Sequence, residues 1–321
     1  MTTFTEYLEE VKPVVDEKIE KVAHRKLKDD YLVELLVRGK RLRAGLLSLV
    51  FESTCDKRFT STLDLACAIE LAHSASLIID DMLDEDELRR GMPTVHMTEG
   101  HKRAMLDTVG ILSLPYDLVV PYGESYVQSL AETQRGMVSG VLMEVIDDPD
   151  MPASKVYDII IRQKTGKPFG LAASWGYLAG LNGKKNGGNG HASKWTSYGI
   201  HVGKAMQIAD DMTDLKQILQ TKKKTGYGSE LLLLRCVTAE RLAKELFSDI
   251  KHMTLHFEKA KELWSSDGIQ ASLREMLKKE VAAARVCVLE LGLPQSAKRD
   301  LLISAPEEIA HAMLTEKRPA R

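Results

Sequence analysis

Residues 71–84 read LAHSASLIIDDMLD, an apolar stretch compatible with a helix that ends in the acidic cluster Asp80-Asp81-x-x-Asp84. On a helix, the first and last aspartates of such a cluster lie one turn apart on nearly the same face. Three carboxylates this close repel one another unless cations lie between them. Oxygen ligands without His or Cys favour Mg²⁺, which keeps some of its positions for water and substrate phosphates.

A second acidic cluster, Asp210-Asp211-x-x-Asp214, repeats this pattern later in the chain and is also flanked by apolar residues. One cluster of this kind is often a solvated surface, but two in apolar surroundings argue against that interpretation. We predict that the clusters face each other and hold one polyphosphate through about three Mg²⁺ ions, replaceable by Mn²⁺.

The bulk composition excludes several classes of protein. The 321 residues carry 44 Lys and Arg against 46 Asp and Glu, so no global field recruits nucleic acid or an anionic membrane. The N-terminus lacks the features of a signal peptide, and no apolar run approaches about 18 residues, so we expect a cytoplasmic protein without a transmembrane segment. Widely spaced cysteines predict buried free thiols in a reducing compartment: Cys55, Cys67, Cys236 and Cys287.

Apolar residues recur at helical spacing almost throughout the chain. Residues 4–22, 242–257 and 269–281 each predict an amphipathic helix, and no segment alternates as a strand does. The sequence therefore predicts an all-α protein. Its breaks are too short to be linkers, so we expect one domain over residues 1–321, with a flexible loop at about 182–190 and a tail at about 315–321.

Four groups of basic residues accompany the acidic clusters. Lys40 and Arg43 are three residues apart and so expected on one helical face, while Lys164 precedes Thr165. Further pairs and runs follow the acidic clusters: Arg89-Arg90 and Lys222-Lys223-Lys224. Each group alone is usually a solvated surface. Together they predict two diphosphates, one held through metal and the other by direct cationic contacts.

In this order the motifs resemble those of the trans-isoprenyl diphosphate synthases, over about residues 36 to 232. The resemblance implies a helical bundle around a central cavity and a homodimer. Carried over by position, it assigns the isopentenyl diphosphate pocket to Lys40, Arg43, His73 and Arg90. It assigns contacts with the allylic diphosphate to Arg89, Lys164, Thr165, Gln207 and Lys224. The metal ligands would be the six aspartates, with Asp84 and Asp214 less direct than the others.

The mechanism that the resemblance implies is ionisation, condensation and elimination. Metal ions and cationic side chains stabilise the departing diphosphate, and water is excluded so that the allylic cation is not quenched. The π bond of isopentenyl diphosphate then attacks the cation, and a proton is lost. Dipoles of Thr165 and Gln207 would stabilise the cation. The catalytic set is Asp80, Asp81, Asp210, Lys164, Thr165 and Gln207.

Three small residues before the first cluster bear on product length: Ala72, Ala75 and Ser76. In the family that the chain resembles, an aromatic residue there stops the growing chain at farnesyl. Because none is present, we predict a linear product of C20 or longer. Small residues at these positions would also allow close helix packing. The sequence does not fix the allylic starter or the pathway.

Several residues depart from the usual family pattern: Ala44, Ile79, Thr108, Val109, Val141 and Glu230. Two alternatives remain open at this point. A class I terpene cyclase shares the first acidic motif, but it usually has an Asn-Ser-Glu type second motif and needs no second diphosphate pocket. A regulatory subunit with weak or lost catalysis would be consistent with Val109 and Val141, although the six intact aspartates argue against it.

Overall fold

The computed structural model describes residues 2–89, 91–145, 151–181, 189–221, 229–238, 246–249 and 254–316. The first half contains α1 (Phe4–Lys26), α2 (Asp30–Val37), α3 (Leu42–Thr54), η1 (Phe59–Thr62), α4 (Leu63–Leu83), β1 (Leu88–Arg89), β2 (Met92–Pro93), α5 (Val95–Glu99), α6 (His101–Val119), η2 (Val120–Tyr122) and α7 (Glu124–Val145). The second half contains α8 (Ala153–Ile161), η3 (Arg162–Gly166), α9 (Lys167–Leu181), α10 (Asn189–Thr221), α11 (Ser229–Val237), β3 (Phe247–Asp249), β4 (Thr254–Leu255), α13 (Phe257–Trp264), α14 (Asp267–Glu290) and α15 (Ala297–Thr315).

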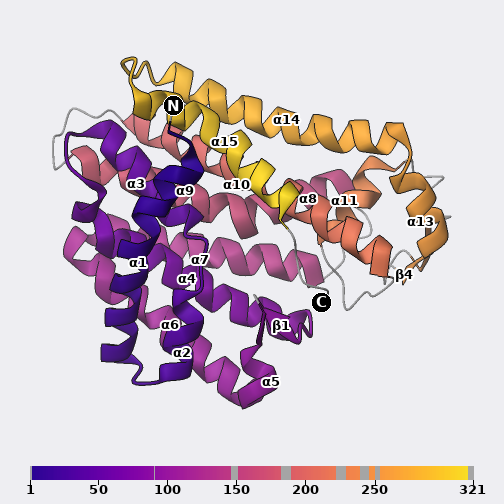
Figure 1. Cartoon of the computed structure of the whole chain (residues 1–321), viewed down its shortest axis with the longest axis horizontal. Helices are drawn as coiled ribbons and strands as arrows, with labels where there is room; N and C mark the ends of the chain where they lie inside the picture. Colours follow the sequence, from indigo (N-terminus) through magenta and orange to yellow (C-terminus); the bar gives the residue numbers. More distant parts are fainter. Residues whose placement is uncertain are drawn as a thin grey trace.

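The helices form a bundle around α10, which confirms the predicted all-α class. The long helix α10 packs against α9, α14 and α15, while α3 packs on α9 and α4 packs on α6. In Figure 1, α14 lies along one edge of the bundle, with α15 between it and the centre. Aromatic side chains fill the main core beside α10, where Trp175, Trp195 and Tyr198 are almost fully buried. The first acidic cluster lies at the C-terminal end of α4, and the second lies within α10.

The first helix forms as its apolar spacing predicts. Thr3 caps its N-terminus in a capping box with Glu6, which satisfies two backbone donors of the first turn. Its buried stripe consists of residues at three- and four-residue steps: Phe4, Tyr7, Val11, Val15, Ile19 and Val22. The predicted helix over residues 269–281 is also confirmed, since it lies inside α14.

The predicted helix over residues 242–257 is wrong for the described residues 247–249 and 254–255. There strands β3 and β4 pair with each other in antiparallel orientation, and the next helix begins only at Phe257. Residues Met253, Leu255 and Phe257 alternate with polar residues, which is the period of a strand. The i, i+4 spacing that suggested a helix is compatible with that alternation as well.

The loop and the tail that were expected from the sequence lie partly outside the described residues. Of the loop expected at about 182–190, residues 182–188 lie outside the described residues, and α10 already begins at Asn189. The helix α15 extends to Thr315, where the tail was expected to start, and residues 317–321 are not described. All four cysteines are free, as predicted, but only Cys67 is fully buried.

Two helical stretches among the described residues are long and apolar enough to cross a membrane, judged by length and composition alone. They are Phe59–Leu83, with a mean hydropathy of 1.4, and His101–Tyr122, with 1.3. The expectation that no stretch reaches this length and apolarity is therefore wrong as a statement about composition. The first stretch contains the core helix α4, whose burial explains its apolar residues. The second is less buried and exposes several apolar side chains.

Candidate functional site

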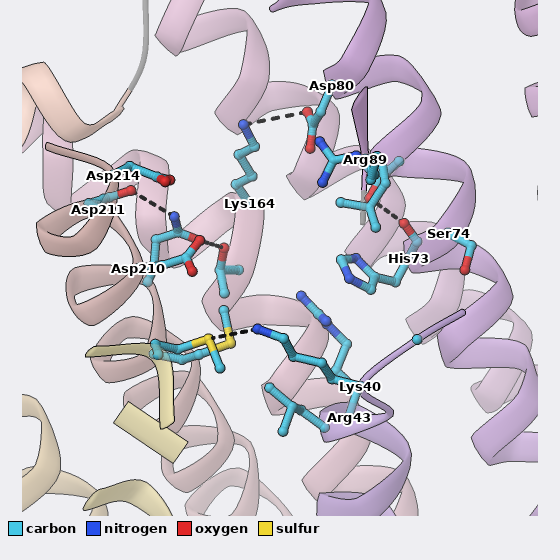
Figure 2. A pocket seen from close by; sticks show the side chains of 18 of the residues that line it. Lys40, Arg43, His73, Ser74, Asp80, Arg89, Lys164, Asp210, Asp211 and Asp214 are labelled. Atoms are coloured by element: carbon cyan, nitrogen blue, oxygen red, sulfur yellow. Dashed lines mark hydrogen bonds and ion pairs between the residues drawn. The ribbon is translucent and has the colours of Figure 1, made fainter. Parts of the chain in front are cut away.

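A cavity of about 530 Å³ lies between α4 and α10 and brings most of the predicted site residues together. Figure 2 shows Asp80 and Asp210 on opposite walls, with Lys164 between them and Lys40 below. The predicted residues that line the cavity are Lys40, Arg43, His73, Ser76, Asp80, Asp84, Arg89, Lys164, Thr165, Gln207, Asp210, Asp211 and Asp214. Two predicted residues, Arg90 and Lys224, lie outside the described residues.

In the first acidic cluster, Asp80 and Asp84 face the cavity and Asp81 does not. The turn of α4 separates them, because residues one apart on a helix point in different directions. Asp81 is only 3% exposed, and its carboxylate accepts a hydrogen bond from Arg89 Nε. Burial raises the pKa of Asp81 to about 6 against the opposing effect of Arg89. Burial also raises the pKa of Asp84, to about 7, against the effect of Lys164.

In the second acidic cluster, the middle aspartate is again withdrawn from solvent. Asp211 is 2% exposed and accepts hydrogen bonds from Tyr157 Oη at 2.7 Å, Ser229 Oγ at 2.8 Å and Gln207 Nε2 at 2.9 Å. Burial raises the pKa of Asp211 well above its ordinary value, although these three donors favour the ionised form. Asp210 and Asp214, one turn apart, face the cavity.

The lysine between the clusters sits in an unusual turn. Residues Arg162–Gly166 form a π-helical segment, η3, between α8 and α9, and such segments are frequent at functional sites. Lys164 Nζ donates to Glu144 Oε2 at 2.9 Å and lies 3.4 Å from Asp80 Oδ1. Burial alone would lower the pKa of Lys164, but these two carboxylates outweigh it and raise the pKa. Lys164 is therefore a permanent cation beside the first cluster.

Glu144 is a cavity residue that the sequence analysis missed. It is buried on α7 and lines the cavity beside Lys164. Its signal in the sequence is a lone carboxylate within the apolar run 141–145, where an unpaired charge would be costly. The close approach of α7 to η3 depends on Gly140, where a Cβ atom would come within 2.9 Å of Gln163 Cβ and 3.1 Å of Lys164 N.

Thr165 and Gln207 are hydrogen-bonded to each other. The Thr165 hydroxyl donates to Gln207 Oε1 at 2.6 Å, and the amide nitrogen of the same glutamine donates to Asp211. Both ends of the Gln207 amide are therefore engaged within the protein. This chain of hydrogen bonds links η3 to the second acidic cluster and fixes the orientation of both side chains.

Lys40 and Arg43 both line the opposite end of the cavity. The prediction that they share one helical face is wrong, because α3 begins only at Leu42 and Lys40 lies in the loop before it. Arg43 is buried, with its guanidinium 4.7 Å from the centre of the Phe169 ring. Lys40 Nζ donates to Glu316 Oε2 at 2.6 Å. His73 reaches this part of the cavity from α4, as Figure 2 shows.

The shape of this loop depends on Arg41, to which the sequence analysis gave no role. Arg41 has a left-handed backbone (φ 60°), and its buried guanidinium donates to Asp16 Oδ1 and to the Leu36 carbonyl, both at 2.6 Å. Glu70 Oε2 lies 3.6 Å from the same guanidinium. A Cβ atom on Gly39 would come within 2.3 Å of Arg41 Nη1, so any other residue there would displace the Arg41 guanidinium.

The residues expected to set product length are only partly at the cavity. Ser76 lines it, but Ala72 and Ala75 are buried in the core and are not part of its wall. Of the three residues, only Ser76 is therefore in direct contact with this cavity. Of the departures from the family pattern, Glu230 lines the cavity, Val141 is half-buried outside it, and Val109 is 68% exposed on α6.

The donor set of the cavity fits a hard divalent cation that shares its ligands with a substrate. Within the described part of the chain, no three acidic, His or Cys side chains are placed to hold one ion by themselves. The first cluster instead presents Asp80 and Asp84 to the cavity. The second presents Asp210 and Asp214, while Asp211, which also lines the cavity, is engaged by three hydrogen-bond donors of the protein. Mg²⁺ commonly takes one or two carboxylates and completes its shell with water and phosphate oxygens.

Known proteins resemble this chain in sequence. Residues 26–229 match the polyprenyl synthetase family model. A geranylfarnesyl diphosphate synthase from Methanosarcina mazei is 29% identical over 70% of this chain and 74% of its own length. A geranylgeranyl diphosphate synthase from Pseudescherichia vulneris is 31% identical, over 67% and 74% respectively. A farnesyl diphosphate synthase from Geobacillus stearothermophilus is 30% identical, over 66% and 75%.

Solved structures share the fold over nearly the whole chain. A polyprenyl synthase from Caulobacter crescentus superimposes with a TM-score of 0.77 at 21% identity, covering 95% of this chain and 97% of that one. A heptaprenyl diphosphate synthase from Staphylococcus aureus gives 0.78 at 22% identity, covering 95% and 98%. These structures place the bundle among the all-α isoprenoid synthase folds.

Proposed function

The chain belongs to the polyprenyl synthetase family, and on this premise we propose that it condenses isopentenyl diphosphate head-to-tail with an allylic diphosphate, in an Mg²⁺-dependent reaction. The product is a linear trans-polyprenyl diphosphate, of C20 or longer. The observation that carries this proposal is a single cavity with two ends of different chemistry. One end has facing pairs of carboxylates and the other has Lys40, Arg43 and His73.

The carboxylate end suits the allylic diphosphate. Asp80, Asp84, Asp210 and Asp214 would hold divalent cations, which when bound neutralise the charge that develops on the departing diphosphate. Lys164 adds a permanent positive charge beside them. The Caulobacter relative, whose structure is described as a complex with calcium and isoprenyl diphosphate, supports a divalent cation next to this class of substrate.

The buried aspartates act by holding other groups. Asp81 pairs with Arg89, which keeps that guanidinium at the cavity wall for a direct contact with the allylic diphosphate. Asp211 orients Gln207, whose carbonyl is in turn held by Thr165. Oriented dipoles beside the reacting carbon favour a positive charge there and do not react with it.

The basic end suits the diphosphate of isopentenyl diphosphate. Lys40 and Arg43 provide two cations, and His73 provides a ring that can donate to a phosphate oxygen. Holding this substrate against the allylic cation aligns its double bond for attack. The proton released on elimination goes to the departing diphosphate. Additional contacts from Arg90 and Lys224 rest on the family resemblance.

The names of three curated relatives span products from farnesyl to geranylfarnesyl diphosphate, so the relatives do not fix the product length of this chain. The proposal of C20 or longer rests on the small side chains of Ala72, Ala75 and Ser76 on α4. Of these three residues, Ser76 lines the cavity, so Ser76→Phe narrows the space open to the growing chain, and we expect it to shorten the main product. An unchanged product distribution contradicts this part of the proposal.

The protein is proposed to work in the cytoplasm as a homodimer, and the exposed apolar side chains of α6 and α7 support the homodimer. Met105, Leu106 and Val109 on α6 are each more than half exposed, as is Val138 on α7, and Leu142 is similar. Contiguous exposed apolar surface on a folded domain usually marks an interface. A second copy of this chain, docked through α6 and α7, would bury these side chains.

The deciding experiment is product analysis of the purified protein with Mg²⁺, labelled isopentenyl diphosphate and each of four starters: dimethylallyl, geranyl, farnesyl and geranylgeranyl diphosphate. We expect linear products of C20 or longer, and none with EDTA. A main product of C15 would retain the enzyme class but contradict the proposed chain length. No elongated product from any starter would overturn the proposed function.

A further inference from the structure

The last turn of α15 lies across the basic end of the cavity. Glu316 Oε2 accepts from Lys40 Nζ at 2.6 Å, and Met313 Sδ lies 3.5 Å from the same nitrogen. The Met313 carbonyl accepts from Thr213 Oγ1 at 3.1 Å, and Thr213 belongs to the second acidic cluster. This turn therefore connects Lys40 to α10, and both Met313 and Glu316 line the cavity.

The helix that carries Glu316 does not favour a carboxylate at this position. Glu316 is the C-cap residue of α15, where the backbone carbonyls give the helix end a partial negative charge. No basic residue occupies the last turn of α15 to offset it. The contact with Lys40 is a favourable electrostatic interaction that offsets this effect for the Glu316 carboxylate.

We infer that Glu316 is an intramolecular competitor of the substrate diphosphate for Lys40. This inference rests on the proposed function, which assigns Lys40 to isopentenyl diphosphate. A substrate anion can form its full contact with Lys40 only after the Glu316 carboxylate has moved away. The apparent affinity for the anion is therefore reduced in proportion to the fraction of molecules in which the Lys40–Glu316 ion pair is formed. A diphosphate displaces it because it offers more negative charge and more acceptor oxygens than one carboxylate. Glu316 therefore weakens binding of isopentenyl diphosphate and leaves binding of the allylic diphosphate unchanged.

The test is to replace Glu316→Gln, which removes the charge and keeps the size of the side chain. The matched control is Glu307→Gln, since Glu307 is an exposed glutamate of the same helix that pairs with Arg285. Two quantities are measured for each protein: the Kd of inorganic diphosphate in EDTA, and the KM for isopentenyl diphosphate at a saturating allylic substrate. Because the Lys40–Glu316 pair is partly exposed, we expect E316Q to lower both the Kd of inorganic diphosphate and the KM for isopentenyl diphosphate by about three-fold. E307Q should change neither, and the allylic KM should stay constant.

A further variant separates competition from a structural role. In a Lys40→Met background, E316Q should no longer tighten diphosphate binding, because the shared partner is gone. Unchanged or weaker diphosphate binding in E316Q, at an unchanged melting temperature, overturns the inference. If E316Q unfolds early, Glu316→Asp provides the same test, because its shorter side chain cannot hold the same contact. Absence of any prenyl product contradicts the proposed function, while the EDTA titration still decides the competition at Lys40.

Discussion

The two acidic clusters have the same pattern but different partners. In each, the outer aspartates face the cavity and the middle aspartate is buried. Asp81 pairs with a cation, Arg89, whereas the three described hydrogen-bond donors of Asp211 are all uncharged: Tyr157, Gln207 and Ser229. The first cluster also has Lys164 within 3.4 Å of Asp80. Among these contacts, the cationic ones offset negative charge at the first cluster, whereas the donors to Asp211 bring no charge to the second. We therefore expect the second cluster to depend more on the positive charge of bound metal ions.

The largest effect is expected from removing a cavity-facing carboxylate of either cluster. Asp80→Asn and Asp210→Asn should each reduce kcat/KM by about 10³-fold, because each removes a ligand of the metal ions whose positive charge stabilises the leaving diphosphate. If the clusters differ as proposed, D210N should also need more Mg²⁺ for half-maximal activity than D80N. Asp117→Asn, at an exposed ion pair, is the control. Equal Mg²⁺ requirements in D80N and D210N would remove the proposed difference.

The next effect concerns the two buried aspartates. Asp81→Asn removes the closer of the two carboxylates that pair with Arg89 at a largely buried site and leaves Asp86 Oδ2 at 3.6 Å, so we expect a loss of about 2 kcal/mol in the free energy of unfolding. Asp211→Asn keeps an acceptor for neutral donors and should cost only about 1 kcal/mol. Denaturant unfolding of both variants in EDTA measures the difference. A larger loss for D211N than for D81N contradicts the comparison.

Local spacing was enough to predict the helical class, and the family resemblance supplied most of the cavity residues. The i, i+4 relation placed Asp80 with Asp84 and Asp210 with Asp214, and the structure shows both pairs at the cavity. What spacing could not provide is contact between distant segments. Glu144 meets Lys164 only through the packing of α7 on η3, and Glu316 meets Lys40 only because α15 returns to the cavity.

The errors of the sequence analysis have the same origin. Lys40 and Arg43 were expected on one helix because they are three residues apart, but the left-handed Arg41 places Lys40 in a loop before α3. Arg41 also forms a largely buried ion pair with Asp16 of α1. This partner lies 25 positions away, so no local pattern encodes the contact.

A smaller effect is expected from one hydrogen bond to the second cluster. Tyr157→Phe removes the donor to Asp211 Oδ2, which should cost about 1 kcal/mol and raise the Mg²⁺ concentration for half-maximal activity by about three- to five-fold. Tyr198→Phe is the matched control, because Tyr198 is equally buried and its hydroxyl also donates at 2.7 Å, to the Leu302 carbonyl away from the cavity. A Mg²⁺ shift of the same size in Y198F would show that the effect is general destabilisation.

A further effect is the dependence of the metal-free protein's stability on pH. Burial raises the pKa of Asp84 to about 7 from its ordinary value of 3.8, so between these pH values the folded state binds a proton that the unfolded state has released. The free energy of unfolding should therefore fall as pH rises through this window, by up to about 1 kcal/mol per pH unit. Asp84→Asn should flatten this slope, as measured by denaturant unfolding in EDTA between pH 4.5 and 7. An identical slope in D84N and wild type would mean that Asp84 is ionised in the folded protein, and that Lys164 offsets the charge of the first cluster more completely than burial opposes it.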